Sequence, residues 1–139
     1  MRVLFDTNVI LDLLLDRKPH SQAAGELLSA VEASQISGYV CATTITTIHY
    51  LATKVVGARK ARAEIRKLLS LLEVAPVNRS VLDGAVRSKV TDYEDAVICE
   101  AARQVSADAV VTRNARDFKS SGIRVYTPME MIKVLDSGA

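Results

Sequence analysis

The sequence predicts an α/β fold in which a parallel sheet is covered by helices on both faces. Short apolar runs alternate with longer amphipathic stretches along the whole chain, and turn and cap residues separate them. Strands that alternate with helices form βαβ units, whose strands pair in parallel. At 139 residues the chain has the length of one domain, so we expect residues 1–139 to form a single domain.

Five apolar runs are predicted as strands. The first is followed directly by the polar residues Asp6, Thr7 and Asn8, and the third is ended by Asn78. The predicted strands are Arg2 to Phe5, Gly38 to Ala42, Glu73 to Val77, Ala109 to Thr112 and Arg124 to Tyr126.

Cap signals mark several of the predicted helices. Thr91 and Glu94 have the spacing of a capping box, as do Thr127 and Glu130, with Pro128 at its favoured first helical position. The predicted helices are Val9 to Leu15, Pro19 to about Ser34, Thr44 to Val56, Ala58 to Leu72, one that starts at Ser80 with Asp83 as its box-like partner, Asp92 to about Val105, and the tail from Pro128.

The composition excludes several classes of protein. The chain is 49% hydrophobic and 24% charged, as in ordinary globular proteins, and its net charge of +2 is too small to indicate nucleic-acid binding by itself. Cys41 and Cys99 are too few for a disulfide framework or a zinc quartet, and we interpret both as core thiols. No apolar stretch approaches the roughly 18 residues of a membrane span, and no signal peptide is recognisable. We therefore expect a cytoplasmic protein without a membrane segment.

Four acids are predicted to meet at the carboxyl edge of the sheet. Asp6 directly follows the first strand, and Asp117 lies a few residues beyond the fourth. Asp92 and Asp95 are three residues apart at a helix start, so they lie about 60° apart on one helix face. Open parallel sheets bind their ligands beyond the carboxyl ends of the strands. The order of the elements therefore predicts one acidic site.

Carboxylates gathered this closely repel one another, and a hard divalent cation is the usual way to neutralise them. Mg²⁺ or Mn²⁺ takes oxygen ligands and serves phosphate chemistry. Asp12 and Asp16 are interpreted as solvent-facing or loop acids, and Glu94 as a capping residue outside the site. The predicted catalytic and metal-binding acids are Asp6, Asp92, Asp95 and Asp117.

Each acid also has a simpler interpretation. Asp6 could cap the helix after the first strand, and Asp92 could be a first-turn acid favoured by the helix dipole. Asp117 could be the partner of an Asn114 cap. Independent caps have no reason to share one edge of the sheet, so we prefer the interpretation as a site.

Three segments around these acids resemble the PIN-domain family, the metal-dependent ribonucleases that include the VapC-type toxins of toxin–antitoxin pairs. The resemblance extends over nearly residues 2 to 135. It implies a three-layer α/β/α PIN-like fold with a five-stranded parallel sheet, a metal-dependent endoribonuclease that uses Mg²⁺ or Mn²⁺, a possible antitoxin partner and a homodimer. The matching segments are Phe5 to Asp12, Asp92 to Ile98 and Val111 to Phe118.

The resemblance also implies roles for individual residues. Asp6, Asp95 and Asp117 would bind metal, and Asp92 matches an additional acid of some members. Arg113 could contact the scissile phosphate, or it could be an exposed structural arginine. The residues that would orient the acids or the attacking water by hydrogen bonds are Thr7, Asn8, Thr112 and Asn114.

One position departs from the family pattern. His49 stands where the family usually has a glutamate, in the helix after the second strand. It could still contact a metal or a phosphate, or it could be a neutral, hydrogen-bonded helix histidine. The departure leaves an alternative function open, a catalytically weakened PIN-like module that binds RNA or protein.

The segment after Gly57 gathers basic residues. Arg59, Arg62 and Arg66 follow helical spacing along one face and could contact RNA phosphates, although a solvated helix face that includes Glu64 has the same pattern. The two helices around Gly57 are also more apolar than a surface pair needs, which favours a homodimer through them.

Overall fold

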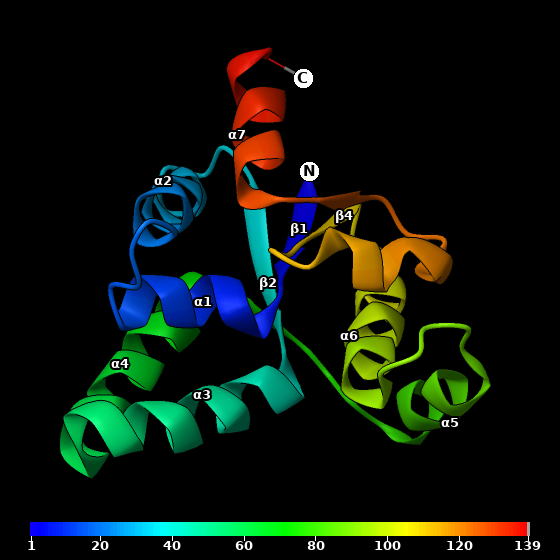
Figure 1. The fold of residues 1–139 in the computed structure, drawn as a ribbon, viewed down its shortest axis with the longest axis horizontal. Coiled ribbons are helices and arrows are strands. Elements are labelled where there is room, and N and C mark those ends of the chain that lie inside the picture. The colour runs from blue at the N-terminus through cyan, green and yellow to red at the C-terminus, as the bar shows by residue number, and fades with distance from the viewer. Residues whose placement is uncertain (139) are drawn as a thin grey trace.

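The computed structural model describes residues 1–138 and has a five-stranded, all-parallel sheet with the order β3-β2-β1-β4-β5 (Figure 1). The predicted strands and their parallel pairing are confirmed, with ends shifted by up to two residues. The strands are β1 (Arg2–Phe5), β2 (Ser37–Cys41), β3 (Glu73–Ala75), β4 (Ala109–Val111) and β5 (Val125–Tyr126).

The chain starts in the middle of the sheet and extends it in two directions. From β1 it moves outward through β2 to β3, and it then returns to the other side of β1 with β4 and β5. The strand order therefore reverses between β1 and β4. In open parallel sheets this switch point is where ligands bind, because the loops that follow the two strands diverge there.

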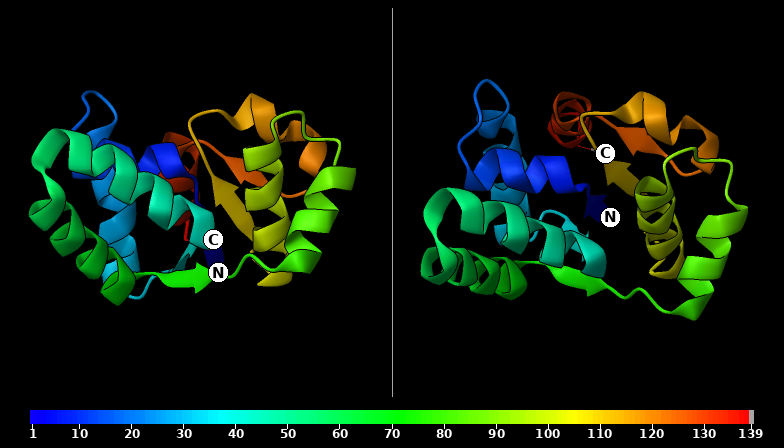
Figure 2. Two further views of the ribbon diagram at one scale, coloured as in Figure 1. Left: turned by 90° about the horizontal axis from the view of Figure 1, so that it is seen from below. Right: turned by 60° about the horizontal axis from the view of Figure 1, so that its bottom comes forward.

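The helices lie on both faces of the sheet (Figures 1 and 2), which confirms the predicted α/β/α arrangement. One face carries the first four helices and the last, and the other carries the two helices between β3 and β4 with the 3₁₀ helix η1. The helical elements are α1 (Thr7–Leu14), α2 (Ser21–Glu32), α3 (Ala42–Val56), α4 (Ala58–Leu71), α5 (Arg79–Arg87), α6 (Tyr93–Gln104), η1 (Ala115–Ser121) and α7 (Pro128–Asp136).

Alternation along β1 divides the hydrophobic core between the two faces. Val3 and Phe5 are fully buried on the α1–α4 side, whereas Leu4 is fully buried on the α5–α6 side. A strand that is apolar on both faces is typical of the centre of a parallel sheet. Both cysteines, Cys41 and Cys99, are buried in the second of these cores, as predicted.

Two of the predicted helix caps are wrong and one is confirmed. Helix α6 is capped by Asp92, whose Oδ1 accepts from the backbone N–H of Asp95 at 3.0 Å, and not by the Thr91–Glu94 box. Similarly, Asn78 caps α5 in place of Ser80. Aspartate is a stronger N-cap than threonine, which explains why Asp92 and not Thr91 caps α6. In α5, Asn78 accepts from the Val81 N–H at 3.1 Å. The capping box of α7 is present as predicted.

Among the described residues, 1–138, no helix has the length and apolar character that crossing a bilayer requires.

Candidate metal and phosphate site

Asp6 lies at the switch point and is held there by several hydrogen bonds. It caps α1 through Oδ1, which accepts from the Thr7 N–H at 2.8 Å. Its Oδ2 accepts from the Thr112 hydroxyl at 2.7 Å and from the Asn8 amide at 3.3 Å. The cap explains why α1 begins at Thr7, earlier than predicted. Asp6 is therefore both a cap and part of the acidic edge.

The residues predicted to orient the acids contact Asp6 in different ways. Thr112 and Asn8 reach it with their side chains, whereas Thr7 uses its backbone and shares a hydroxyl hydrogen bond of 2.9 Å with Thr44 of α3. Asn114 acts one step further away, because its N–H donates to the Thr112 hydroxyl at 3.0 Å. Thr112 is fully buried, so its hydroxyl fixes the position of the Asp6 carboxylate.

Asp92 and Asp95 approach from the first turn of α6. Asp95 is half-buried, while Asp92 and Asp117 are exposed. The pKa of Asp95 is raised to about 7, first by burial and then by the negative charges of the neighbouring acids Asp6, Asp92, Asp117 and Glu94. Acids from separate segments of the chain thus act electrostatically on one carboxyl group. The structure therefore brings the charges of all four predicted acids to one region.

The pKa of Asp6 is also raised, mainly because burial disfavours its charged form. The hydrogen bonds from Thr112 and Thr7 and the positive charge of Arg113 oppose this effect, whereas the charge of Asp92 adds to it. Asp6 and Asp92 are therefore close enough to repel each other. A cation between these carboxylates would remove the repulsion.

The four acids lie in one region, but their side chains are not arranged to coordinate a metal ion. Within residues 1–138, no three His, Cys, Asp or Glu side chains have the placement that would hold an ion. The donors themselves suit a divalent cation, because they are carboxylate oxygens, the ligands that Mg²⁺ and Mn²⁺ prefer. The raised pKa of Asp95 shows that its negative charge is disfavoured beside the other acids, and a bound cation would relieve this. The residues therefore fit a hard cation by chemistry and charge.

A pocket of about 550 Å³ joins two of the acids to positive charge. Asp92 and Asp117 line it together with Arg116 and Lys119. Acids beside exposed cations provide both halves of a phosphate site, a place for a cation and donors for phosphate oxygens. The sequence pointed to the acids but not to Arg116 and Lys119. Both lie in η1, where no helical or strand pattern in the sequence could be followed.

Asp12 is not the solvent-facing acid that the sequence suggested. Its side chain is 1% exposed and forms a two-point ion pair with Arg113, with Nε–Oδ2 at 2.6 Å and Nη2–Oδ1 at 3.2 Å. Arg17 adds a weaker contact at 3.9 Å. Arg113 is thus a fixed cation close to Asp6, whereas Asp16 is exposed, as expected.

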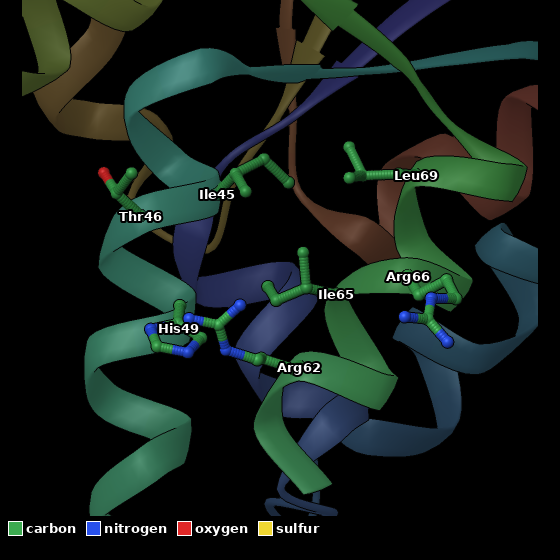
Figure 3. Close-up of a pocket in the computed structure, with 7 residues that line it drawn as sticks. All are labelled: Ile45, Thr46, His49, Arg62, Ile65, Arg66 and Leu69. Carbon is green, nitrogen blue, oxygen red and sulfur yellow. The ribbon is translucent and has the colours of Figure 1, made fainter. Parts of the chain in front are cut away.

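His49 lines a different pocket from the one that Asp92 and Asp117 line. It lines a pocket of about 480 Å³ between α3 and α4, together with Arg62 and Arg66 (Figure 3). None of the four acids lines this pocket. The Nε2 atom of His49 is buried without a hydrogen-bond partner among the described residues. The hydrogen-bonded helix histidine that the sequence suggested is therefore not what the structure shows.

The basic residues of α4 lie on its surface. Arg59, Arg62 and Arg66 are exposed, and Lys67 pairs with Glu64 at 3.4 Å. The predicted helical stripe is present, and two of its three arginines reach the pocket between α3 and α4.

Comparisons with known proteins agree with this arrangement. Residues 2–116 match the family model described as PIN domain. Ribonuclease VapC1 of Aquifex aeolicus is 23% identical over 134 residues, which cover 93% of this chain and 92% of that protein. A chain of a toxin–antitoxin complex from Klebsiella pneumoniae is 26% identical, with a TM-score of 0.68 over 91% of this chain and 97% of its own. A chain of VapBC2 from Rickettsia felis, bound to a promoter DNA fragment, has a TM-score of 0.73 at 14% identity, over 91% and 98% of the two chains.

Proposed function

This chain belongs to the PIN-domain family, and from that membership we propose that it is an endoribonuclease that hydrolyses RNA phosphodiester bonds with Mg²⁺ or Mn²⁺. The observation that carries the proposal is the electrostatic convergence on Asp95. The charges of Asp6, Asp92 and Asp117 all raise its pKa, although the chain separates Asp6 from Asp117 by more than a hundred residues.

The cation would be held by Asp6, Asp92, Asp95 and Asp117, and it would activate water and stabilise negative charge on the phosphate. The protein's own residues prepare this edge of the sheet. Thr112 and Asn8 keep the Asp6 carboxylate in one orientation, which lowers the cost of arranging it for the reaction. Asp92 keeps the first turn of α6 in place through its cap, so Asp95 stays at the same edge.

The RNA would be bound through its phosphates. Arg116 and Lys119 lie in one pocket with Asp92 and Asp117, so they are placed to neutralise a phosphate beside the acids. Arg113 is a further phosphate contact in this proposal. Arg59, Arg62 and Arg66 on α4 would guide more distant parts of the strand, with an affinity that falls as the salt concentration rises.

The partners proposed from the relatives are an antitoxin and a second copy of this chain. The Klebsiella protein belongs to a toxin–antitoxin complex, and an antitoxin of this chain would cover the acidic edge, with an arginine on the carboxylates. The homodimer would use α3 and α4, where Tyr50, Val55 and Leu69 are 60%, 66% and 49% exposed. The protein would act in the cytoplasm as one domain, residues 1–139.

The test is cleavage of structured RNA in Mn²⁺. Asp6→Asn and Asp95→Asn are expected to lower the rate at least about 100-fold, because each removes a charge that the cation needs. Asp136→Asn is the matched control, because Asp136 is an exposed acid at the end of α7, and it should cleave like wild type. Equal cleavage by all four proteins would refute the assignment of the site.

The alternative, a module that binds RNA without cutting it, predicts RNA association and no metal-dependent turnover in wild type. His49→Glu does not distinguish the two functions, because His49 lies in the pocket between α3 and α4. A wild-type protein that binds RNA and stays inactive over a range of Mg²⁺ and Mn²⁺ concentrations would favour the alternative.

A further inference from the structure

A second hollow lies next to the acidic edge, on the side of α2 and α7. It has a volume of about 450 Å³, and its wall includes Pro19, His20, Ala23, Arg113, Pro128 and Met129. None of the four acids lines it. It is therefore a space distinct from the proposed metal site, with Arg113 as its strongest charge.

Arg113 is held rigidly in the wall of this hollow by Asp12. Two nitrogens of the guanidinium, Nε and Nη2, donate to the two oxygens of a carboxylate that is 1% exposed. A two-point contact of this kind fixes the plane of the guanidinium. Nη1 makes no hydrogen bond among residues 1–138, and the side chain remains 29% exposed. One nitrogen thus stays available for an anion.

The same residue connects the hollow to the acidic edge. The N–H of Arg113 donates to the Asn8 side chain at 3.3 Å, and Asn8 in turn donates to Asp6. Thr112, the preceding residue, donates to Asp6 as well. Hydrogen bonds therefore link Arg113 in the wall of the hollow to Asp6 at the acidic edge through one residue, Asn8.

The remaining wall suits a flat, largely apolar group. Pro19, Pro128 and Met129 present apolar surface, and Met129 is 58% exposed although it borders a cavity. Methionine adapts to the faces of aromatic rings and contacts them favourably. The start of α7 does not itself offer an anion site. The N–H groups there are already used by the capping box, because the Thr127 N–H donates to Glu130 at 2.8 Å and the Glu130 N–H donates to Thr127 at 3.2 Å.

We propose that this hollow is a subsite for the nucleotide that adjoins the scissile phosphate of the RNA. Its phosphate would accept from Nη1 of Arg113, and its base would lie against Pro19, Pro128 and Met129. Asp12 is a positioning residue in this subsite, since it acts through Arg113. The subsite presupposes that the RNA is cut at the acidic edge, as proposed above.

The direct test observes the methionine methyl groups by NMR while a single-stranded 2′-O-methyl RNA trinucleotide, which resists cleavage, is added. The Met129 methyl signal is expected to shift in a saturable manner. Met131, which is fully buried in the core below α7, and Met1, which lies outside the hollow, serve as internal controls. Arg113→Lys keeps a cation beside Asp12 but loses the planar guanidinium and its free Nη1, and it should weaken RNA binding about 5- to 10-fold. No response of Met129, or an equal response of all three methyl groups, would overturn the subsite.

A second measurement uses the cleavage products of a randomised RNA pool. Wild type is expected to prefer particular bases at one position beside the cut. Met129→Ala should reduce this preference at least about 5-fold and raise KM more than it lowers kcat. Val86→Ala is the matched control, because Val86 is 72% exposed on α5 at the other face, and it should keep the preference. An unchanged preference in Met129→Ala would contradict the subsite. Absence of any cleavage would instead contradict the nuclease proposal and with it the role of the subsite in cleavage, and the NMR titration would then decide whether the hollow binds RNA.

Discussion

Asp95 combines a functional position with a cost to stability. Its pKa is raised from 3.8 to about 7 by burial and by the neighbouring acids, so the folded protein binds this proton more tightly than the unfolded chain does. The contribution of Asp95 to the free energy of unfolding is therefore greatest at low pH. It is lost as the pH rises from about 4 to about 7 and is constant above that range.

We expect Asp95→Asn to unfold at a higher temperature than wild type in EDTA at pH 7 to 8, because the substitution removes a repelled charge. The difference should shrink as the pH is lowered towards 4. Thermal unfolding followed by circular dichroism at several pH values measures both effects. A lower melting temperature for Asp95→Asn in EDTA would show that Asp95 is not repelled by its neighbours.

His49 allows a prediction that separates stability from activity. Its buried Nε2 has no partner among the described residues, and a buried polar atom without a hydrogen bond is destabilising. His49→Met removes this atom and keeps much of the volume. The free energy of unfolding should be unchanged or higher by about 1 kcal/mol, and RNA cleavage should be retained, because none of the four acids lines the pocket of His49.

Urea unfolding and an RNA cleavage assay check the two parts of this prediction. A folded His49→Met protein that no longer cleaves RNA would mean that His49 contributes to the reaction, as the sequence had left open.

At the scale of elements, close packing decides where two glycines tolerate change. A Cβ at Gly38 in β2 would lie 2.6 Å from Cδ2 of Leu72 and 2.7 Å from Cγ2 of Val31, both in the buried core. Gly38→Ala should therefore lower the free energy of unfolding by about 1 to 3 kcal/mol. Gly25 in α2 is the matched control, since the nearest atom to its Cβ would be 3.7 Å away.

Gly25→Ala should raise the free energy of unfolding by about 0.4 to 1 kcal/mol, because alanine favours the helix and restricts the unfolded chain. Urea denaturation of both variants gives the comparison. A Gly38→Ala protein as stable as Gly25→Ala would mean that β2 and α2 are packed less tightly than the structure shows.

The helices and strands also show which parts of the fold local sequence signals predict. The five strands and the capping box of Thr127 and Glu130 were predicted, because apolar runs and cap spacing are local signals. The caps of α5 and α6 were misassigned by two residues and one residue, at Asn78 and Asp92. Adjacent candidates such as Thr91 and Asp92 compete for the same cap, and the capping-box spacing pointed to the weaker of the two.

At the scale of the whole molecule, the two cores determine the chemistry of the cysteines. Cys41 and Cys99 are buried between the sheet and the α5–α6 layer, and burial raises the pKa of Cys99 to about 12. The thiolate is the reactive form of cysteine. The folded protein should therefore react with a disulfide reagent such as DTNB only as fast as it opens, whereas both thiols should react at once in denaturant.

The rate of DTNB reaction at pH 8, with and without guanidinium chloride, tests this expectation. Rapid reaction of one thiol in the native protein would show that the α5–α6 layer opens locally.

The sequence by itself determined the succession of strands and helices along the chain and the parallel pairing of the strands. It also predicted that the four acids lie at the carboxyl edge of the sheet. These follow from hydropathy period, cap residues and the geometry of parallel strands, all of which act over short stretches of chain. The tertiary structure alone decided which polar side chains meet. Asp12 is buried against Arg113, a hundred residues away in sequence, and His49 lies between α3 and α4. Contacts between distant side chains depend on how whole helices pack, and no local pattern in the sequence records that packing.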